Sequence, residues 1–172
     1  MKVCLALLLT GLLLHFPANA ELKKVDKLKA AYMFNFTRFI QWPDSQTMPL
    51  TLCIQDNPQL SDFMIRLIAS KPGQQKKNPL RVMPLSLSTP CDIAFLHKPV
   101  PEYRGTLTRT MVISDSQSVA IENAVFTFFE QDSRLRFEVT LANARALNLS
   151  ISSELLKVAT ICLLYTSDAA DE

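Results

Sequence analysis

The sequence predicts an α/β sandwich with a mixed β-sheet that ends in a β-hairpin and a helix. Apolar segments with strand character alternate with segments of helical periodicity up to residue 114. Residues 125–130 and 134–141 then flank a polar turn, and the second arm alternates apolar and polar residues. Alternating strands and helices favour a layered α/β fold, and the hairpin adds antiparallel strands.

The first predicted helix covers residues 22–41. Trp42-Pro43 ends it, because the residue before a proline disfavours helical backbone. Five apolar residues recur on one face at helical spacing, and they are Val25, Leu28, Tyr32, Phe36 and Phe39. Phe34 falls on the otherwise polar side.

The next elements alternate between strand and helix. Residues 49–55 form a buried strand, and residues 59–70 carry apolar positions at helical spacing. Residues 80–87 form a second strand, in which Pro84 indicates an edge or a break. Residues 91–96 form a third strand.

The remaining elements complete the sandwich. We expect a short helix near residues 102–108, a fourth strand at 111–114, the hairpin, and a short helical segment at 142–147. Ser152 or Ser153 then caps a last helix. Its packing residues are Leu155, Val158 and Ala159.

The two ends of the chain lie outside this domain. Residues 1–20 have a charged start, a short apolar run and a small-residue cleavage site, the pattern of an export signal peptide. The apolar run is shorter than the roughly 20 residues that span a bilayer, so we expect no stable membrane insertion. Residues 162–172 resemble a translated sequencing adapter, and we expect a non-native tail. A single domain would then span residues 21–161.

The composition of the domain argues against an enzyme and against nucleic acid as a partner. Without the signal and the tail, Lys and Arg fall from 18 to 17, and Asp and Glu from 16 to 13, so the net charge is a diffuse +4. Two glycines, Gly73 and Gly105, cannot build a phosphate-binding loop. His97 is the one histidine, and we interpret it as a solvated loop residue. We therefore predict no cofactor and no metal site.

Two features of the domain could carry a binding function. Tyr32, Phe34 and Trp42, with Arg38 at the edge, could form an exposed aromatic patch that contacts a partner or a second copy of the chain. In the alternative, the sheet or the last helix covers Phe34. The remaining cysteines, Cys53 and Cys91, form an even pair, which favours a disulfide in an exported protein over two separate buried thiols.

Several segments, taken in order, resemble the YfiR-like family. They are the helix from Lys29 to Pro43, Cys53, the Cys91-Asp92 strand, the hairpin around Arg134–Val139, and Ser152–Ala159. Glu122-Asn123-Ala124 departs from the family, which often has glycines before the hairpin. The resemblance implies a periplasmic protein with a disulfide between Cys53 and Cys91.

The resemblance also implies a function. The family's best-known member binds the periplasmic sensor domain of an inner-membrane diguanylate cyclase and represses it, which limits cyclic-di-GMP signalling and biofilm formation. The alternative is a periplasmic small-ligand-binding module that serves another sensor, such as a histidine kinase. An apolar pocket with convergent polar groups would favour that alternative.

Overall fold

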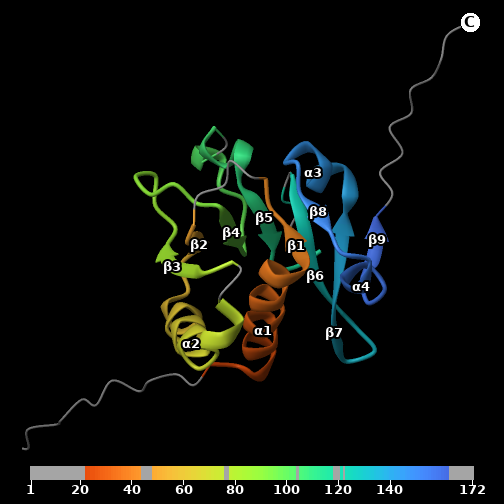
Figure 1. The fold of residues 1–172 in the computed structure, drawn as a ribbon, viewed down its shortest axis with the longest axis horizontal. Coiled ribbons are helices and arrows are strands. Elements are labelled where there is room, and N and C mark those ends of the chain that lie inside the picture. The colour runs from red at the N-terminus through yellow and green to blue at the C-terminus, as the bar shows by residue number, and fades with distance from the viewer. Residues whose placement is uncertain are drawn as a thin grey trace, which may run out of the picture.

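A computed structural model describes residues 22–43, 48–75, 78–103, 105–117, 121 and 123–162 (Figure 1). The predicted signal peptide lies outside the described residues, as does the predicted tail after Cys162. Within the described residues the helical elements are α1 Lys24–Phe39, α2 Pro58–Ala69, η1 Pro72–Gln75, η2 Pro101–Tyr103, η3 Thr106–Arg109, α3 Leu141–Ala146 and α4 Ser153–Leu156. The fold is mixed α/β, as the sequence predicted.

The main sheet has the strand order β3-β2-β4-β5-β6-β7-β9 in the described residues, and β1 pairs separately with β8. The strands are β1 Ile40–Gln41, β2 Leu50–Ile54, β3 Leu80–Pro84, β4 Ile93–Leu96, β5 Met111–Ser114, β6 Ala124–Gln131, β7 Arg134–Thr140, β8 Ser150–Ile151 and β9 Thr160–Cys162. The strands from β3 to β6 in this order are parallel, β7 is antiparallel to β6, and β9 is parallel to β7.

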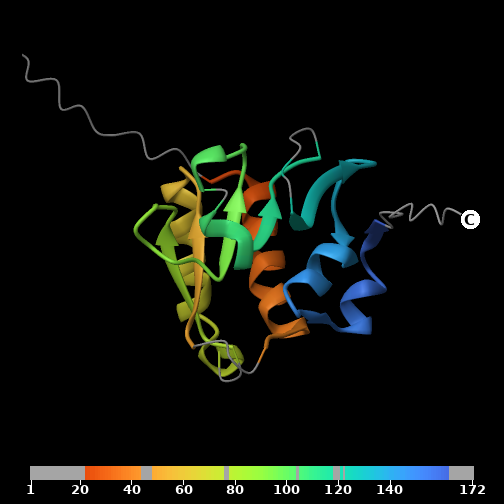
Figure 2. The same ribbon diagram turned by 90° about the horizontal axis from the view of Figure 1, so that it is seen from above.

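Helices α1 and α2 pack side by side and cover one face of the sheet. Figure 2 shows α3 and α4 at the end of the molecule opposite α2. On the other face, a smaller cluster around Leu96 and Val112 is covered by Leu107 of η3 and by the loop residues Leu85 and Val100. Both faces are therefore buried, which explains why β2, β4 and β5 are apolar with little alternation.

Phe36 is the centre of the main core. Its side chain is fully buried, and its ring stacks on Phe126 with centroids 4.1 Å apart. Phe137 meets the same ring edge-on at 5.0 Å. Offset stacks and edge contacts of this kind add to the apolar burial, so Phe36 fixes α1 on the hairpin.

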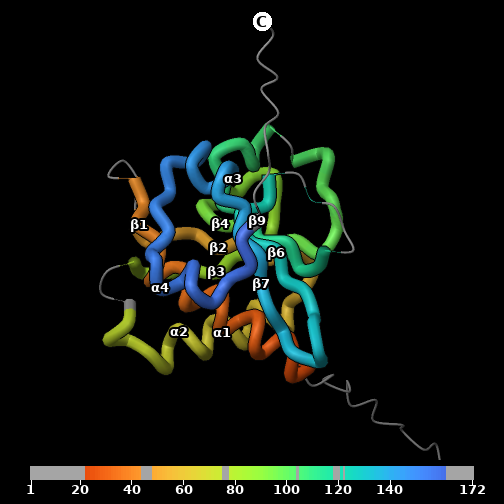
Figure 3. Tube along the Cα trace, turned by 90° about the vertical axis from the view of Figure 1, so that its right-hand side faces the viewer, coloured from red at the N-terminus to blue at the C-terminus, as the bar shows by residue number. Residues whose placement is uncertain are grey.

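Two distant segments close the end of α1. The buried Asn78 side chain donates its Nδ2 hydrogen to the carbonyl oxygen of Thr37, 2.5 Å away. The Ser152 N–H donates to the carbonyl oxygen of Phe39 at 2.9 Å. The last carbonyls of a helix lack partners inside the helix, so these two bonds satisfy groups that would otherwise be buried without one. Figure 3 shows the closing segment with β8 running beside β1.

The buried face of α1 differs from the predicted one. Leu28 is 44% exposed, whereas Lys29 and Thr37 are buried. The helix also ends at Phe39, since Ile40 and Gln41 join β1. Lys29 pairs with Asp115 after β5, and the carbonyl oxygen of Thr37 accepts from Asn78, so segments far away in the sequence contact these two residues.

The closing part of the domain also departs from the prediction. The last helix has only four residues, and Val158 is 67% exposed, because the chain turns into β9. Thr140, a polar residue of the alternating second arm, is buried. The expected helix at residues 102–108 is formed instead by the 3₁₀ turns η2 and η3.

Two turns explain how the hairpin forms without glycine. Asp132 and Ser133 both have positive φ, at 50° and 57°, the conformation of a two-residue hairpin turn whose twist suits the strands. Asn123 has φ 62° at the point where the family often has glycine. Asparagine tolerates this left-handed conformation better than most residues, so the turn before β6 forms here without glycine.

We expect Phe36→Ala to lower the free energy of unfolding by about 3–5 kcal/mol, because it opens a cavity between α1 and the hairpin. Urea unfolding followed by the fluorescence of Trp42, the one tryptophan in the chain, measures this loss. Leu28→Ala on the same helix is the control, with an expected change within about 0.5 kcal/mol. Equal losses for the two variants would contradict the assignment of Phe36 to the centre of the core.

Candidate functional site

The predicted aromatic patch is not exposed as a whole. Phe34 is only 3% exposed and belongs to the main core, together with Leu60 and Met64 of α2. The placement of Phe34 on an exposed surface is therefore wrong. Its burial agrees with the alternative, which named the sheet or the last helix as the cover, and α2 also packs beside α1.

The other three residues of the predicted patch have different surroundings. Tyr32 is partly buried, with its ring centroid 5.4 Å from that of Phe137. Trp42 is also partly buried, and its indole Nε1 has no hydrogen-bond partner among the described residues. Arg38 is exposed, with its guanidinium carbon 5.7 Å from the centre of the Phe39 ring. Arg38 is thus the member of this set that a partner can reach most directly.

Helix α1 carries a buried lysine, Lys29, that was not predicted from the sequence. Lys29 is 9% exposed, and its Nζ lies 2.5 Å from a carboxylate oxygen of Asp115, directly after β5. This ion pair joins the start of α1 to the end of the parallel sheet. Removing one partner would leave the other charge poorly solvated, which is costly. A signal was present, since Lys29 precedes Met33 and Phe36 by one and two helical turns.

The sheet order reverses between β2 and β4, the place where open parallel sheets usually hold ligands beyond the carboxyl ends of their strands. Gln55 follows β2 there and is 3% exposed. Its Oε1 accepts the backbone N–H groups of His97 and Lys98 at 2.9 and 3.1 Å. Two successive N–H groups can hold an anion. Here they hold the protein's own side chain.

The contact of His97 with Gln55 is made by its backbone N–H group. Beside it, Lys98 and Asp56 form an ion pair with Nζ and Oδ2 2.8 Å apart. The hydrogen bond from Lys98 holds the pKa of Asp56 below its ordinary value. More than half of each side chain is exposed, so solvent screens the pair and it contributes little to stability.

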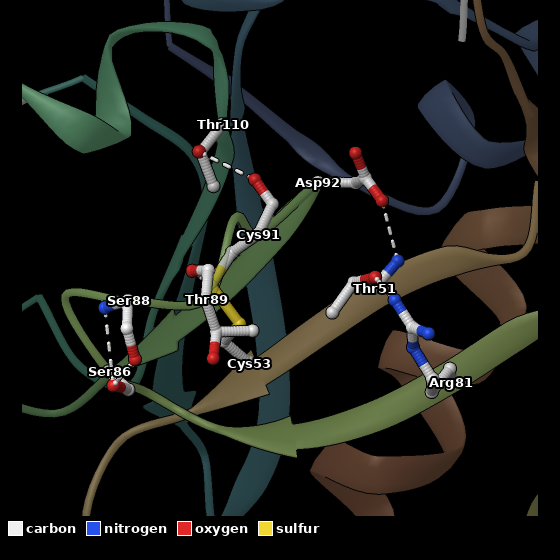
Figure 4. Close-up of a disulfide and its surroundings, with 9 residues drawn as sticks. All are labelled: Thr51, Cys53, Arg81, Ser86, Ser88, Thr89, Cys91, Asp92 and Thr110. Carbon is white, nitrogen blue, oxygen red and sulfur yellow. Dashed lines mark hydrogen bonds between the residues drawn. A yellow bond between two sulfur atoms is a disulfide. The ribbon is translucent and has the colours of Figure 1, made fainter. Parts of the chain in front are cut away.

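The predicted disulfide between Cys53 and Cys91 is present, with Cα atoms 5.8 Å apart (Figure 4). Cys53 lies within β2, and its exposed fraction is zero. Cys91 is partly buried and lies two residues before β4. The disulfide therefore attaches the chain before β4 to the middle of the neighbouring strand.

This attachment has a structural reason. Residues 85–92, which we name the crossover loop, lead from β3 to the parallel strand β4 without a helix. Such crossovers usually contain a helix that packs on the sheet. In this loop the disulfide supplies one contact with the sheet beside the packing of Leu85, and the Thr110 hydroxyl donates to the carbonyl oxygen of Cys91 at 2.8 Å.

Asp92 is the last residue of the crossover loop and forms two hydrogen bonds with Thr51 of β2. The backbone N–H of Thr51 donates to Asp92 Oδ2 at 2.6 Å, and the backbone N–H of Asp92 donates to the Thr51 carbonyl at 2.9 Å. Arg81 of β3 donates from Nη2 to the Thr51 hydroxyl at 2.8 Å. Figure 4 shows these groups beside the disulfide. We name the Asp92–Thr51 pair of bonds the Asp92 clamp.

Comparison with known proteins decides the family. A family model described as YfiR/HmsC-like matches residues 26–160, most of the chain. The chain belongs to the YfiR/HmsC-like family. Members of the YfiR-like family are regulators rather than enzymes. No curated protein matches the chain. No helix in the described ranges is long and apolar enough to cross a membrane.

We expect loss of the disulfide to lower the free energy of unfolding by about 4 kcal/mol in the chain-entropy model. The two cysteines are 38 residues apart, and the bond restricts the unfolded chain over that span. Urea unfolding with and without dithiothreitol measures the difference. A Cys53→Ala/Cys91→Ala variant is the control, because its stability should not respond to the reductant. Unchanged wild-type stability on reduction would contradict the expectation.

Proposed function

We propose that this protein is a periplasmic regulator that binds the periplasmic sensor domain of an inner-membrane diguanylate cyclase and holds the enzyme inactive. The observation that carries the proposal is the family match over residues 26–160. The proposed effect is a lower level of cyclic-di-GMP and less biofilm. The Cys53–Cys91 disulfide supports the location, because disulfides persist in oxidising compartments such as the periplasm.

The end of the parallel sheet supports a protein partner over a small ligand. In open α/β sheets, small ligands bind beyond the carboxyl ends of the strands where the order reverses. In this protein Gln55 fills the pair of backbone N–H groups at that position. A small anionic ligand would have to displace a buried side chain that already makes two hydrogen bonds.

We expect deletion of the gene to raise intracellular cyclic-di-GMP, because the cyclase would lose its repressor. Quantifying cyclic-di-GMP in cell extracts by mass spectrometry measures this change. Complementation with residues 1–161 should restore the lower level, and the same fragment without residues 1–20 should not, since it would stay in the cytoplasm. An unchanged cyclic-di-GMP level after deletion would overturn the proposed function.

Arg38 is the residue of the predicted patch that we propose for direct contact with the partner. We expect Arg38→Glu to weaken binding to the cyclase about 10-fold or more, equivalent to about 1.4 kcal/mol, because it reverses an exposed charge at the interface. Copurification with membrane diguanylate cyclases and cellular cyclic-di-GMP are the measurements.

Arg66→Glu is the matched control for Arg38→Glu. Arg66 is also an exposed arginine near the end of its helix, but it lies on α2. If both variants bind like the wild type, Arg38 is outside the interface. If both lose binding equally, the effect reflects overall charge and the specific role of Arg38 is wrong.

A further inference from the structure

The crossover loop is attached to the sheet at both ends by bonds that do not involve sulfur. At its start, the Leu85 N–H donates to the carbonyl oxygen of Ile54 at 3.0 Å. At its end, the Asp92 clamp holds Thr51, and the N–H of Met111 donates to the Asp92 carbonyl at 2.9 Å. These bonds hold the start of β4 between β2 and β5 without the participation of sulfur.

The middle of the crossover loop depends on the disulfide. Within the described part of the chain, the hydrogen bonds of residues 86–90 stay inside the loop, as in the turn where the Thr89 N–H donates to the Ser86 carbonyl at 3.2 Å. Leu87 at the tip of this turn is 60% exposed. Among the described residues, Cys91 connects this part of the loop to the sheet through its sulfur and to Thr110 through its carbonyl oxygen.

The two cysteines differ in their surroundings. Cys53 lies within the sheet between Met83 of β3 and Ala94 of β4, and its exposed fraction is zero. Cys91 is partly exposed and belongs to the loop. Movement of the loop would therefore carry Cys91 with it, whereas Cys53 belongs to a strand that is paired on both sides.

We infer that reduction of the disulfide releases only the crossover loop, and that Cys91 then becomes the reactive thiol while the Asp92 clamp keeps β2 and β4 in register. The reductant is a dithiol, which donates two electrons and two protons, closes to its own cyclic disulfide and leaves Cys53 and Cys91 as thiols. The inference goes beyond the proposed function and does not depend on it.

Thiol labelling of the folded protein tests the inference. The full chain is reduced with dithiothreitol, desalted and treated with iodoacetamide, so that a cysteine thiolate displaces iodide and forms a carbon–sulfur bond. Peptide mapping by mass spectrometry then follows Cys53 and Cys91 separately from Cys162. We expect Cys91 to react about 10-fold faster than Cys53 or more, since local opening exposes the loop before the sheet.

Two variants test the role of the clamp. Asp92→Ala should bring the labelling rates of Cys53 and Cys91 close together, because the end of the loop and the start of β4 become free. Asp62→Ala, which removes an exposed carboxylate on α2, should keep the wild-type ratio. An Asp92→Ala protein with the wild-type ratio would show that the clamp does not confine the opening.

The wild-type experiment decides the inference even if Asp92→Ala fails to fold. Equal labelling rates for Cys53 and Cys91 would mean that reduction opens the sheet as a whole, and protection of both thiols would mean that the loop stays closed. Either result overturns the inference. Neither bears on the proposed function, which the cyclic-di-GMP measurement tests on its own.

Discussion

The position of α1 is the constraint on which the rest of the structure depends. This helix contacts the hairpin through the stack of Phe36 on Phe126, packs beside α2, and pairs Lys29 with Asp115 at the end of β5. Its last carbonyls bond to Asn78 and Ser152 from two other parts of the chain. A single helix therefore joins the parallel sheet to the antiparallel hairpin, and six of its 16 residues are buried.

Local sequence patterns predicted the elements whose conformation follows from their own residues, without a contribution from distant segments. The strand at residues 111–114 matches β5, and Pro84 ends the edge strand β3 as proline chemistry predicts. The short strands β1, β8 and β9 were missed. Each has two or three residues and exists because a distant segment supplies its partner. No local periodicity can show such a pairing.

In the candidate site, too, some features could be predicted from the sequence and others depend on contacts between distant segments. The pairing of Cys53 with Cys91 was predicted, because cysteine count and family resemblance leave few choices. The placement of Phe34 was wrong, since a helical wheel shows one buried face and the neighbouring helix buries a second. The Asp92 clamp and the Lys29–Asp115 pair join residues far apart in the chain, so only the folded topology brings their charges and donors together.

The pairing of Ile40 with Ile151 has a consequence for the order in which the chain folds. The exit of the first helix is completed by β8, which lies far later in the chain, and closing so long a loop has an entropic cost before any contact offsets it. Folds with many such distant contacts form slowly. A chain of this topology that is exported unfolded would keep its first helix open at one end until β8 has crossed, so premature folding during transport is disfavoured.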